Sequence, residues 1–553
     1  MYMKKIYFVI LFLSVCLLYS CYEDKGNYEY QQLNDVTISI PLETSEYSLG
    51  DVLKIEPTMS FATGKESGDL VYSWSLNRRE ISAERNLNWI VDEEGKYMDL
   101  RLTVTDHRTG VSYFGSEMIT VTSPYVNNGW LILSEKEGTS MLTFLRPTTK
   151  TVQGEGGKEE EVYDCVVTKD VYGISNAGAS LGGKPISISQ HFVSFYSEDK
   201  PEDMTSWIWL VQQGGQGTID ISGSAYQMEG NLPTMFINGG YPQGFEPQRV
   251  YDMLYLSLAI GTDGKIYTRV KESYKLFNTS YFLDEMPLSY KQQPVDGTMI
   301  VRAPRFCDHG GTLLYDKNSK CYFHLCDYWE YYYSSSGGYY KKYSGQLIVP
   351  TITNTPNSEW GKLDDMSGYT VFYLDAYKDN TWSGLNYKSI IEKDSRIYIQ
   401  DFTVHDFSGG NSVDATMNSQ VEATELASII SPEANNKYAL FYSQDTRPYL
   451  LVTHDNILYF YYFKGGEGSR LHKYHEFNAP IASIDVDNTQ NFGHAGVGLE
   501  NGEFYVLDFS DTVISDIINK KDSEDKIAFK QDGLGKIVES IFKWKQAANW
   551  VFQ

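Results

Sequence analysis

The residues best suited to contact a ligand or a partner lie in one aromatic stretch, DYWEYYYSSSGGYYKKYSG, at 327–345. Tyrosine supplies rigid amphipathic contact area, while serine and glycine supply hydrogen bonds and flexibility. The stretch therefore predicts a hairpin that turns at 334–338 and stacks on sugar rings, clasps a peptide or docks on another protein. A strand extension folded back onto the protein body is the alternative. The candidate binding residues are Tyr328, Trp329, Tyr331, Tyr332, Tyr333, Tyr339, Tyr340 and Tyr343.

Two other places contain side chains that bind metal ions. One is a group of cysteines and histidines, namely Cys307, His309, Cys321, His324 and Cys326. Their C-x-H and C-x2-H-x-C spacings are not those of the usual zinc sites, and strand alternation places Cys321 on the face opposite His324 and Cys326. The other is the acidic run at 485–491, which lacks the Gly at position six and the Glu at position twelve of an EF-hand. We therefore predict no metal ion, and a solvated turn at 485–491.

Motifs of known catalytic sites are missing from the sequence, which contains no HExxH, GxSxG, phosphate-loop or Rossmann pattern. Carboxylates are plentiful, but no pair is marked for acid–base catalysis by its position. We therefore predict a non-catalytic protein without a cofactor. A surface hydrolase with an acidic active site remains the alternative.

The N-terminus has the pattern of a lipoprotein signal. Lys4 and Lys5 precede an apolar run at 6–19, which ends at a small residue followed by Cys21. The apolar run is shorter than the roughly 20 residues of a membrane span. We predict a signal peptide at 1–20, acylation of Cys21 and a polar tether at 21–34. The acidic pair at 23–24 resembles the export signal of Bacteroidetes lipoproteins, which implies a place on the outer face of the outer membrane.

Composition bounds the fold and the partners. A chain of 553 residues is too long for one core, so two or more domains are expected. Removal of the signal leaves 45 basic against 72 acidic residues, and such an acidic body repels nucleic acid. Aromatic residues make up 14% of the chain, which suits an all-β protein. The mature body keeps four cysteines, Cys165, Cys307, Cys321 and Cys326, which are too few for a disulfide framework. Strand alternation disfavours a bond between Cys321 and Cys326, and the other pairings are left open.

Short alternating runs between 35 and 123 predict an Ig-like β-sandwich with Trp74 as a core anchor. Tyr72-Ser73-Trp74, and the stretch from Gly95-Lys96-Tyr97 to Asp106, resemble the PKD-like domain of a family of Bacteroidetes lipoproteins. This resemblance implies the same sandwich fold.

From 129 to 553 the chain repeats a hairpin. Five copies have a turn pair followed by a spacer, an apolar residue and a tyrosine, with turn pairs at 263–264, 318–319, 394–395, 455–456 and 501–502. Two weaker copies lie at 129–145 and 207–221. The spacing predicts a β-propeller of about seven blades, with the repeated tyrosine packed between blades. The segment KIVESIF at 536–542 is expected to complete the blade begun by 129–145.

This second part resembles the propeller-like portion that follows the PKD-like domain in the same lipoprotein family, on the stretch GWLILSEKEGTSMLTFL at 129–145. The resemblance implies an accessory outer-membrane lipoprotein of a SusC/SusD-like uptake complex. Its expected partners are a TonB-dependent channel, a SusD-like lid lipoprotein and an oligopeptide or oligosaccharide ligand. A purely structural subunit or an adhesin is a further alternative.

Overall fold

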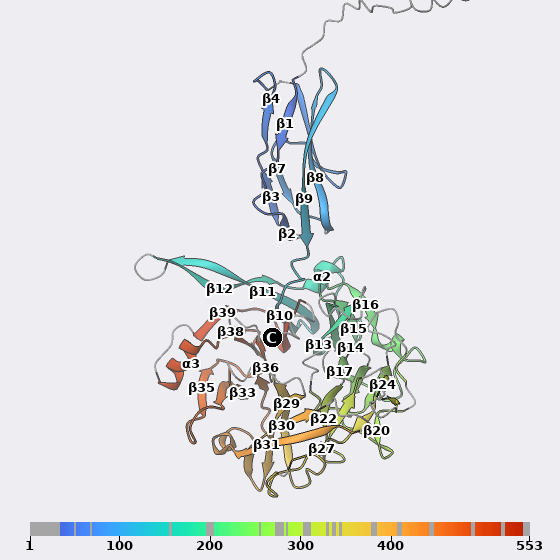
Figure 1. Cartoon of the computed structure of the whole chain (residues 1–553), viewed down its shortest axis with the longest axis vertical. Helices are drawn as coiled ribbons and strands as arrows, with labels where there is room; N and C mark the ends of the chain where they lie inside the picture. The colour runs from blue at the N-terminus through green and yellow to red at the C-terminus, as the bar shows by residue number, and fades with distance from the viewer. Residues whose placement is uncertain are drawn as a thin grey trace, which may run out of the picture. The chain divides into compact units, whose positions relative to one another are not determined.

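The computed structural model divides into two compact units, Met1–Thr122 and Ser123–Gln553. Its secondary structure is almost entirely β (Figure 1). The structure describes residues 34–545, apart from gaps at 49–50, 67–68, 94, 154–157, 195–203, 254–255, 271–280, 284–285, 302–310, 328–330, 334–338, 342–344, 355, 378–383, 406–411, 442–446, 488–492 and 521–525. The predicted signal peptide, Cys21, and the tether up to residue 33 lie outside the described residues.

The first unit is a β-sandwich. Its main sheet has the order β2-β9-β8-β5-β6, and the pairs β1-β4 and β3-β7 complete it. Trp74 has no exposed surface and lies in a core with Leu100 and Leu102, which confirms its role as a core anchor. The strands are β1 (Val36–Ser39), β2 (Glu46–Ser48), β3 (Val52–Ile55), β4 (Thr58–Phe61), β5 (Leu70–Leu76), β6 (Arg79–Ser82), β7 (Leu87–Ile90), β8 (Gly95–Asp106) and β9 (Val111–Thr122).

The second unit is a seven-bladed β-propeller, because its described strands form seven successive sheets of three to five strands. In Figure 1 the blades follow one another from cyan through green and orange to red. The first three blades, written from the inner strand outward, are β40 (Lys536–Lys543), β10 (Gly129–Lys136), β11 (Thr139–Gln153) and β12 (Glu159–Thr168); β13 (Lys184–Ser194), β14 (Met204–Gln213), β15 (Ile219–Ser222) and β16 (Met228–Asn231); and β17 (Pro247–Asp252), β18 (Leu256–Gly261) and β19 (Ile266–Val270).

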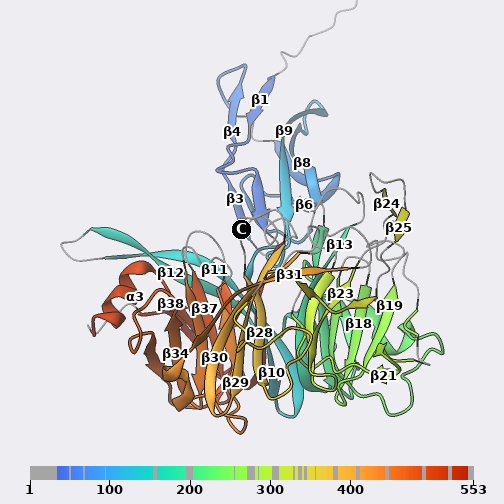
Figure 2. The same cartoon turned by 60° about the horizontal axis from the view of Figure 1, so that its bottom comes forward.

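The remaining four blades continue around the axis, and Figure 2 views them from another side. They are β22 (Gly311–Asp316), β23 (Cys321–Cys326) and β26 (Leu347–Ile348); β28 (Thr370–Tyr377), β29 (Leu385–Lys393), β30 (Arg396–His405), β31 (Asp414–Glu422) and β27 (Thr351–Ile352); β32 (Tyr438–Leu440), β33 (Tyr449–His454), β34 (Ile457–Tyr462) and β35 (Leu471–Glu476); and β36 (Ile481–Asp487), β37 (His494–Leu499), β38 (Phe504–Asp508) and β39 (Ile527–Gln531). In the fourth blade, Ile300 and Val301 occupy the inner position beside β22.

Smaller elements lie in the connections within and between these sheets. They are the hairpins β20 (Ser289–Tyr290) with β21 (Gln293–Pro294) and β24 (Tyr331–Tyr333) with β25 (Tyr339–Lys341), the helices α2 (Val171–Ser175) and α3 (Asp511–Ile518), and the 3-10 turns η3 (Leu232–Met235) and η4 (Thr424–Ser428). Among the described residues, none of the helices is long and apolar enough to cross a bilayer.

All seven predicted hairpins are present, and each provides two adjacent strands of a different blade. The turns differ in their backbone angles: Asp394 and Ser395 both have positive φ, at 51° and 62°, whereas at 318–319 the positive φ falls on the next residue, Lys320. The repeated tyrosine also packs between blades. Tyr322 is fully buried, and its hydroxyl lies 2.8 Å from Ser389 Oγ of the next blade.

The C-terminal strand closes the ring, as predicted. β40 pairs antiparallel with β10, with Trp130 opposite Phe542 and Leu131 opposite Ile541. Side chains of β40 also reach the next blades: Glu539 Oε1 lies 2.8 Å from Arg249 Nη1, and Lys543 Nζ donates to the Gly223 carbonyl at 3.0 Å. The two ends of the propeller sequence therefore form one blade, and that blade is tied to its neighbours.

Candidate functional site

A cavity of about 280 Å³ lies on the axis of the propeller. Residues from the inner position of every blade line it, including Gln190 on β13, Asp252 on β17, Ile300, Asp375 on β28, Tyr438 on β32, Asp485 on β36 and Phe542 on β40. Ring closure is therefore a condition for the cavity, because β40 supplies part of its wall.

Three carboxylates, Asp252, Asp375 and Asp485, line this cavity from three different blades. Asp375 accepts hydrogen bonds from the Tyr373 hydroxyl and from the Ala376 amide, each at 2.8 Å. Asp485 accepts one from the Phe542 amide, also at 2.8 Å. These hydrogen bonds fix the orientation of the two carboxylates, whose oxygens are hydrogen-bond acceptors, at the cavity wall.

Aromatic side chains form another part of the wall. The rings of Tyr373 and Tyr438 stack with their centroids 5.1 Å apart at 24°, and Trp544 packs edge-on against Phe542 at 5.3 Å. Burial raises the pKa of Tyr438 above its ordinary value of 10, so its hydroxyl stays protonated at neutral pH and can donate a hydrogen bond. The cavity thus combines ring surfaces with donors and acceptors, as small-ligand sites do.

Gln190 fixes the cavity wall at the point of closure. Its side-chain amide donates to the Trp544 carbonyl at 2.7 Å and to Ser206 Oγ at 2.7 Å. Its oxygen accepts from the Trp544 amide at 3.0 Å. One side chain of β13 therefore binds both polar groups of a backbone unit in the C-terminal segment, which positions Trp544 in the wall.

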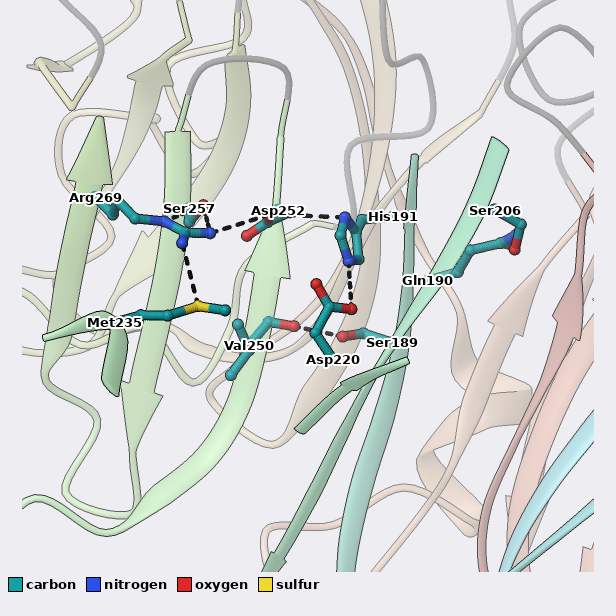
Figure 3. A network of polar contacts seen from close by, with 10 residues as sticks. All are labelled: Ser189, Gln190, His191, Ser206, Asp220, Met235, Val250, Asp252, Ser257 and Arg269. Atoms are coloured by element: carbon teal, nitrogen blue, oxygen red, sulfur yellow. Dashed lines mark hydrogen bonds and ion pairs between the residues drawn. The ribbon is translucent and has the colours of Figure 1, made fainter. Parts of the chain in front are cut away.

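Behind Asp252 lies a buried polar network that joins the second and third blades (Figure 3). His191 Nε2 lies 2.8 Å from Asp220 Oδ1, and His191 Nδ1 lies 3.6 Å from Asp252 Oδ2. Arg269 Nη2 lies 3.5 Å from the same Asp252 oxygen and donates to Ser257 Oγ at 3.0 Å. Burial raises the pKa of the Asp220 carboxyl, and the neighbouring His191 opposes that shift. The network holds the Asp252 side chain at the cavity wall.

Comparison with known proteins supports the N-terminal assignment. Residues 21–185 match the PKD-like family. This match continues past Thr122 into β10, β11 and β12 of the first blade. No curated protein matches the chain.

Several solved structures are similar to the chain at low identity. A Quinonprotein alcohol dehydrogenase-like protein from Bacteroides thetaiotaomicron is 13% identical, with 91% of this chain and 97% of that chain covered and a TM-score of 0.30. Prp20p from Saccharomyces cerevisiae is 9% identical, with 72% of this chain and 87% of that chain covered and a TM-score of 0.29. YCF48 from Cyanidioschyzon merolae is 10% identical, with 58% of this chain and 84% of that chain covered and a TM-score of 0.28. The propeller fold is therefore assigned from the seven sheets of the chain itself and not from these similarities.

The tyrosine-rich stretch forms a hairpin, as predicted, because Tyr332 pairs with Tyr340 and Tyr333 with Tyr339 across 334–338. It connects β23 to β26, so it leaves the fourth blade at the end of β23 opposite to the β22–β23 turn, which also agrees with expectation. Tyr328, Trp329 and Tyr343, and the side chains of the paired tyrosines, lie outside the described residues. Their binding role stays a prediction.

The cysteines and the acidic run complete the comparison with the sequence. No disulfide bond joins Cys165, Cys321 or Cys326 in the described part of the chain. Among the described residues no group of three or more acidic, histidine or cysteine side chains is arranged for a metal ion, and Cys307 and His309 fall outside them. The predicted turn at 485–491 is wrong at its start, because Asp485–Asp487 continue strand β36. Pairing of this segment with β37 outweighs its turn-like composition.

The cavity itself was missed by sequence analysis. Its residues come from strands far apart in the chain, and each looks locally like an ordinary strand residue. The one signal that pointed toward it was the predicted ring closure, because a closed propeller places all inner strands around a single axis.

Proposed function

We propose that this protein is a non-catalytic binding protein that holds an oligopeptide or an oligosaccharide end in the axial cavity of its propeller. The observation that carries the proposal is the cavity wall, in which Asp375 and Asp485 stand beside the stacked Tyr373 and Tyr438. Carboxylates accept hydrogen bonds from amides or hydroxyls, and tyrosine rings cover apolar faces of either ligand.

The proposed setting is the outer surface of the outer membrane. The N-terminal pattern that ends at Cys21 supports acylation there, and the acidic pair after it supports display on the cell exterior. The resemblance of the chain to SusC/SusD-associated lipoproteins supports a role as an accessory component of a TonB-dependent uptake complex. In this proposal the hairpin β24–β25 contacts the ligand or the complex.

A pull-down of the tagged lipoprotein from detergent-solubilised outer membrane, followed by mass spectrometry of proteins, peptides and glycans, tests this setting. Recovery of a channel and a lid lipoprotein in fixed ratio supports the accessory role. Recovery of the protein alone from membranes that contain both contradicts it. A Cys21→Ser variant is the matched control, because it should lose the acyl group and leave the membrane fraction.

The hydrolase alternative has one observation in its favour, the three carboxylates in a single cavity. Acid–base catalysis on glycans uses such carboxylate pairs. Turnover of peptide or glycan substrates that disappears in both Asp375→Asn and Asp485→Asn would support the enzyme and contradict the binding role. Binding without turnover supports our proposal.

A further inference from the structure

β11 and β12 continue past their blade as a two-stranded arm, which comprises 150–153 of β11 and 159–162 of β12. β10 pairs with β11 only between Thr139 and Leu145, so no third described strand extends the sheet along the arm. The arm strands pair with each other from Lys150–Val162 to Gln153–Glu159. Figure 1 shows this cyan hairpin reaching past the edge of the ring.

The arm has no core of its own. All its described residues are exposed except Val152 and Val162, which are half-buried. An isolated two-stranded hairpin is marginally stable in water, and it gains stability when a third strand or another surface covers it. Its outer edges present unpaired backbone groups to solvent, which is the arrangement that β-strand addition uses.

The charge of the arm determines which kind of partner can bind along it. Glu159, Glu160 and Glu161 are consecutive and exposed on β12, the edge strand. Lys150 lies 3.4 Å from Asp164, so its charge is already compensated within the ribbon. A second copy of the chain is a poor occupant, because antiparallel pairing of two β12 edges would bring the glutamates of both copies together.

We infer that the arm is a docking site for an extended, lysine- or arginine-rich strand of a partner protein, which adds to the free edge of β12. Main-chain hydrogen bonds would supply affinity, and alternate basic side chains would meet the glutamates. The inference concerns the arm of the first blade and does not depend on what the axial cavity binds.

The test uses a fluorescein-labelled probe peptide, acetyl-Thr-Lys-Val-Lys-Val-Lys-Thr-amide, in a fluorescence anisotropy titration with the full-length mature protein. Three comparisons are matched to it: a peptide with glutamate in place of lysine, a peptide N-methylated at alternate residues, and protein with a shortened arm. The shortened arm joins Thr149 to Tyr163 by Asn-Gly, because these two residues pair directly and a two-residue turn keeps the register. Its melting temperature shows whether the propeller is intact.

Saturable binding of the lysine probe that is lost with the shortened arm, the N-methylated probe and the glutamate probe supports the inference. The combined variant Glu159→Lys, Glu160→Lys and Glu161→Lys should also lose binding. Equal binding of the N-methylated probe would show that charge alone attracts the peptide and would overturn strand addition. Absence of binding, binding that survives arm shortening, or arm-dependent dimers in sedimentation velocity would each overturn the proposed occupant.

Discussion

Removal of the closing strand, residues 536–553, should abolish cooperative unfolding of the propeller. β40 contributes Ile537, Ile541 and Phe542, whose side chains are exposed by 0%, 2% and 5%. Burial of such side chains contributes about 1.5–3 kcal/mol each, so the three together amount to about 5–9 kcal/mol. The net stability of a domain is only about 5–15 kcal/mol, so this loss is comparable to the whole.

Further losses act in the same direction. The deletion removes the backbone pairing with β10 and leaves the buried edge of β10 without a partner. It also removes Glu539, which accepts from the Ile188 amide at 2.8 Å and pairs with Arg249. These contacts join the first blade to the second and third, so their loss opens the ring.

The assay is urea unfolding followed by near-ultraviolet circular dichroism, with deletion of 546–553 as the control. We expect the shorter deletion to retain the wild-type transition, because it keeps every described residue of β40. We expect the longer deletion to show no cooperative propeller transition. A cooperative transition with wild-type midpoint and slope in the longer deletion would refute the closure argument.

Three further predictions concern single residues. Burial lowers the pKa of Lys543 to about 7, so between pH 7 and about 10 the unfolded chain binds a proton that the folded chain does not. The free energy of unfolding should therefore rise with pH across this window, by up to about 4 kcal/mol more in the wild type than in Lys543→Met, as urea titrations at several pH values would measure. Gly496→Ala should cost about 1–3 kcal/mol, because the added Cβ meets the Trp130 ring at 2.6 Å, whereas Gly240→Ala meets nothing within 4 Å and should be neutral in the same assay. Partial burial raises the pKa of Cys165 to about 12, so a thiol reagent at pH 8 should modify it much more slowly in the folded protein than in urea; equal labelling rates at this site would contradict the raised pKa.

The blades could be predicted from the sequence because their determinants are local. A turn pair such as Asp263-Gly264 marks the point where one strand returns beside another, and the apolar runs on either side become the buried strands β18 and β19. Closure was predictable for a related reason, since KIVESIF at 536–542 resembles the segment PIASIDV at 480–486, which contains the inner strand β36.

The site could not be predicted because its determinants are not local. Asp375 and Asp485 stand side by side with other cavity residues only after the ring has formed. Nothing near His191 in the sequence indicates that it will lie between Asp220 and Asp252, because these carboxylates belong to different blades. The aromatic hairpin had the opposite character. Its composition is conspicuous in the sequence, but none of the described residues that line the cavity belongs to it.

The measurement that tests the binding proposal most directly is a ligand titration against cavity variants. Panels of oligopeptides and oligosaccharides are screened by the shift they cause in the melting temperature, and hits are titrated calorimetrically. We predict saturable binding of one class to the wild type and at least tenfold weaker binding to Asp375→Asn and Tyr438→Ala. Binding to Tyr281→Ala should be unchanged, because Tyr281 is exposed and is not among the residues that line the cavity. Undiminished binding to both cavity variants would contradict the proposal that the axial cavity is the site.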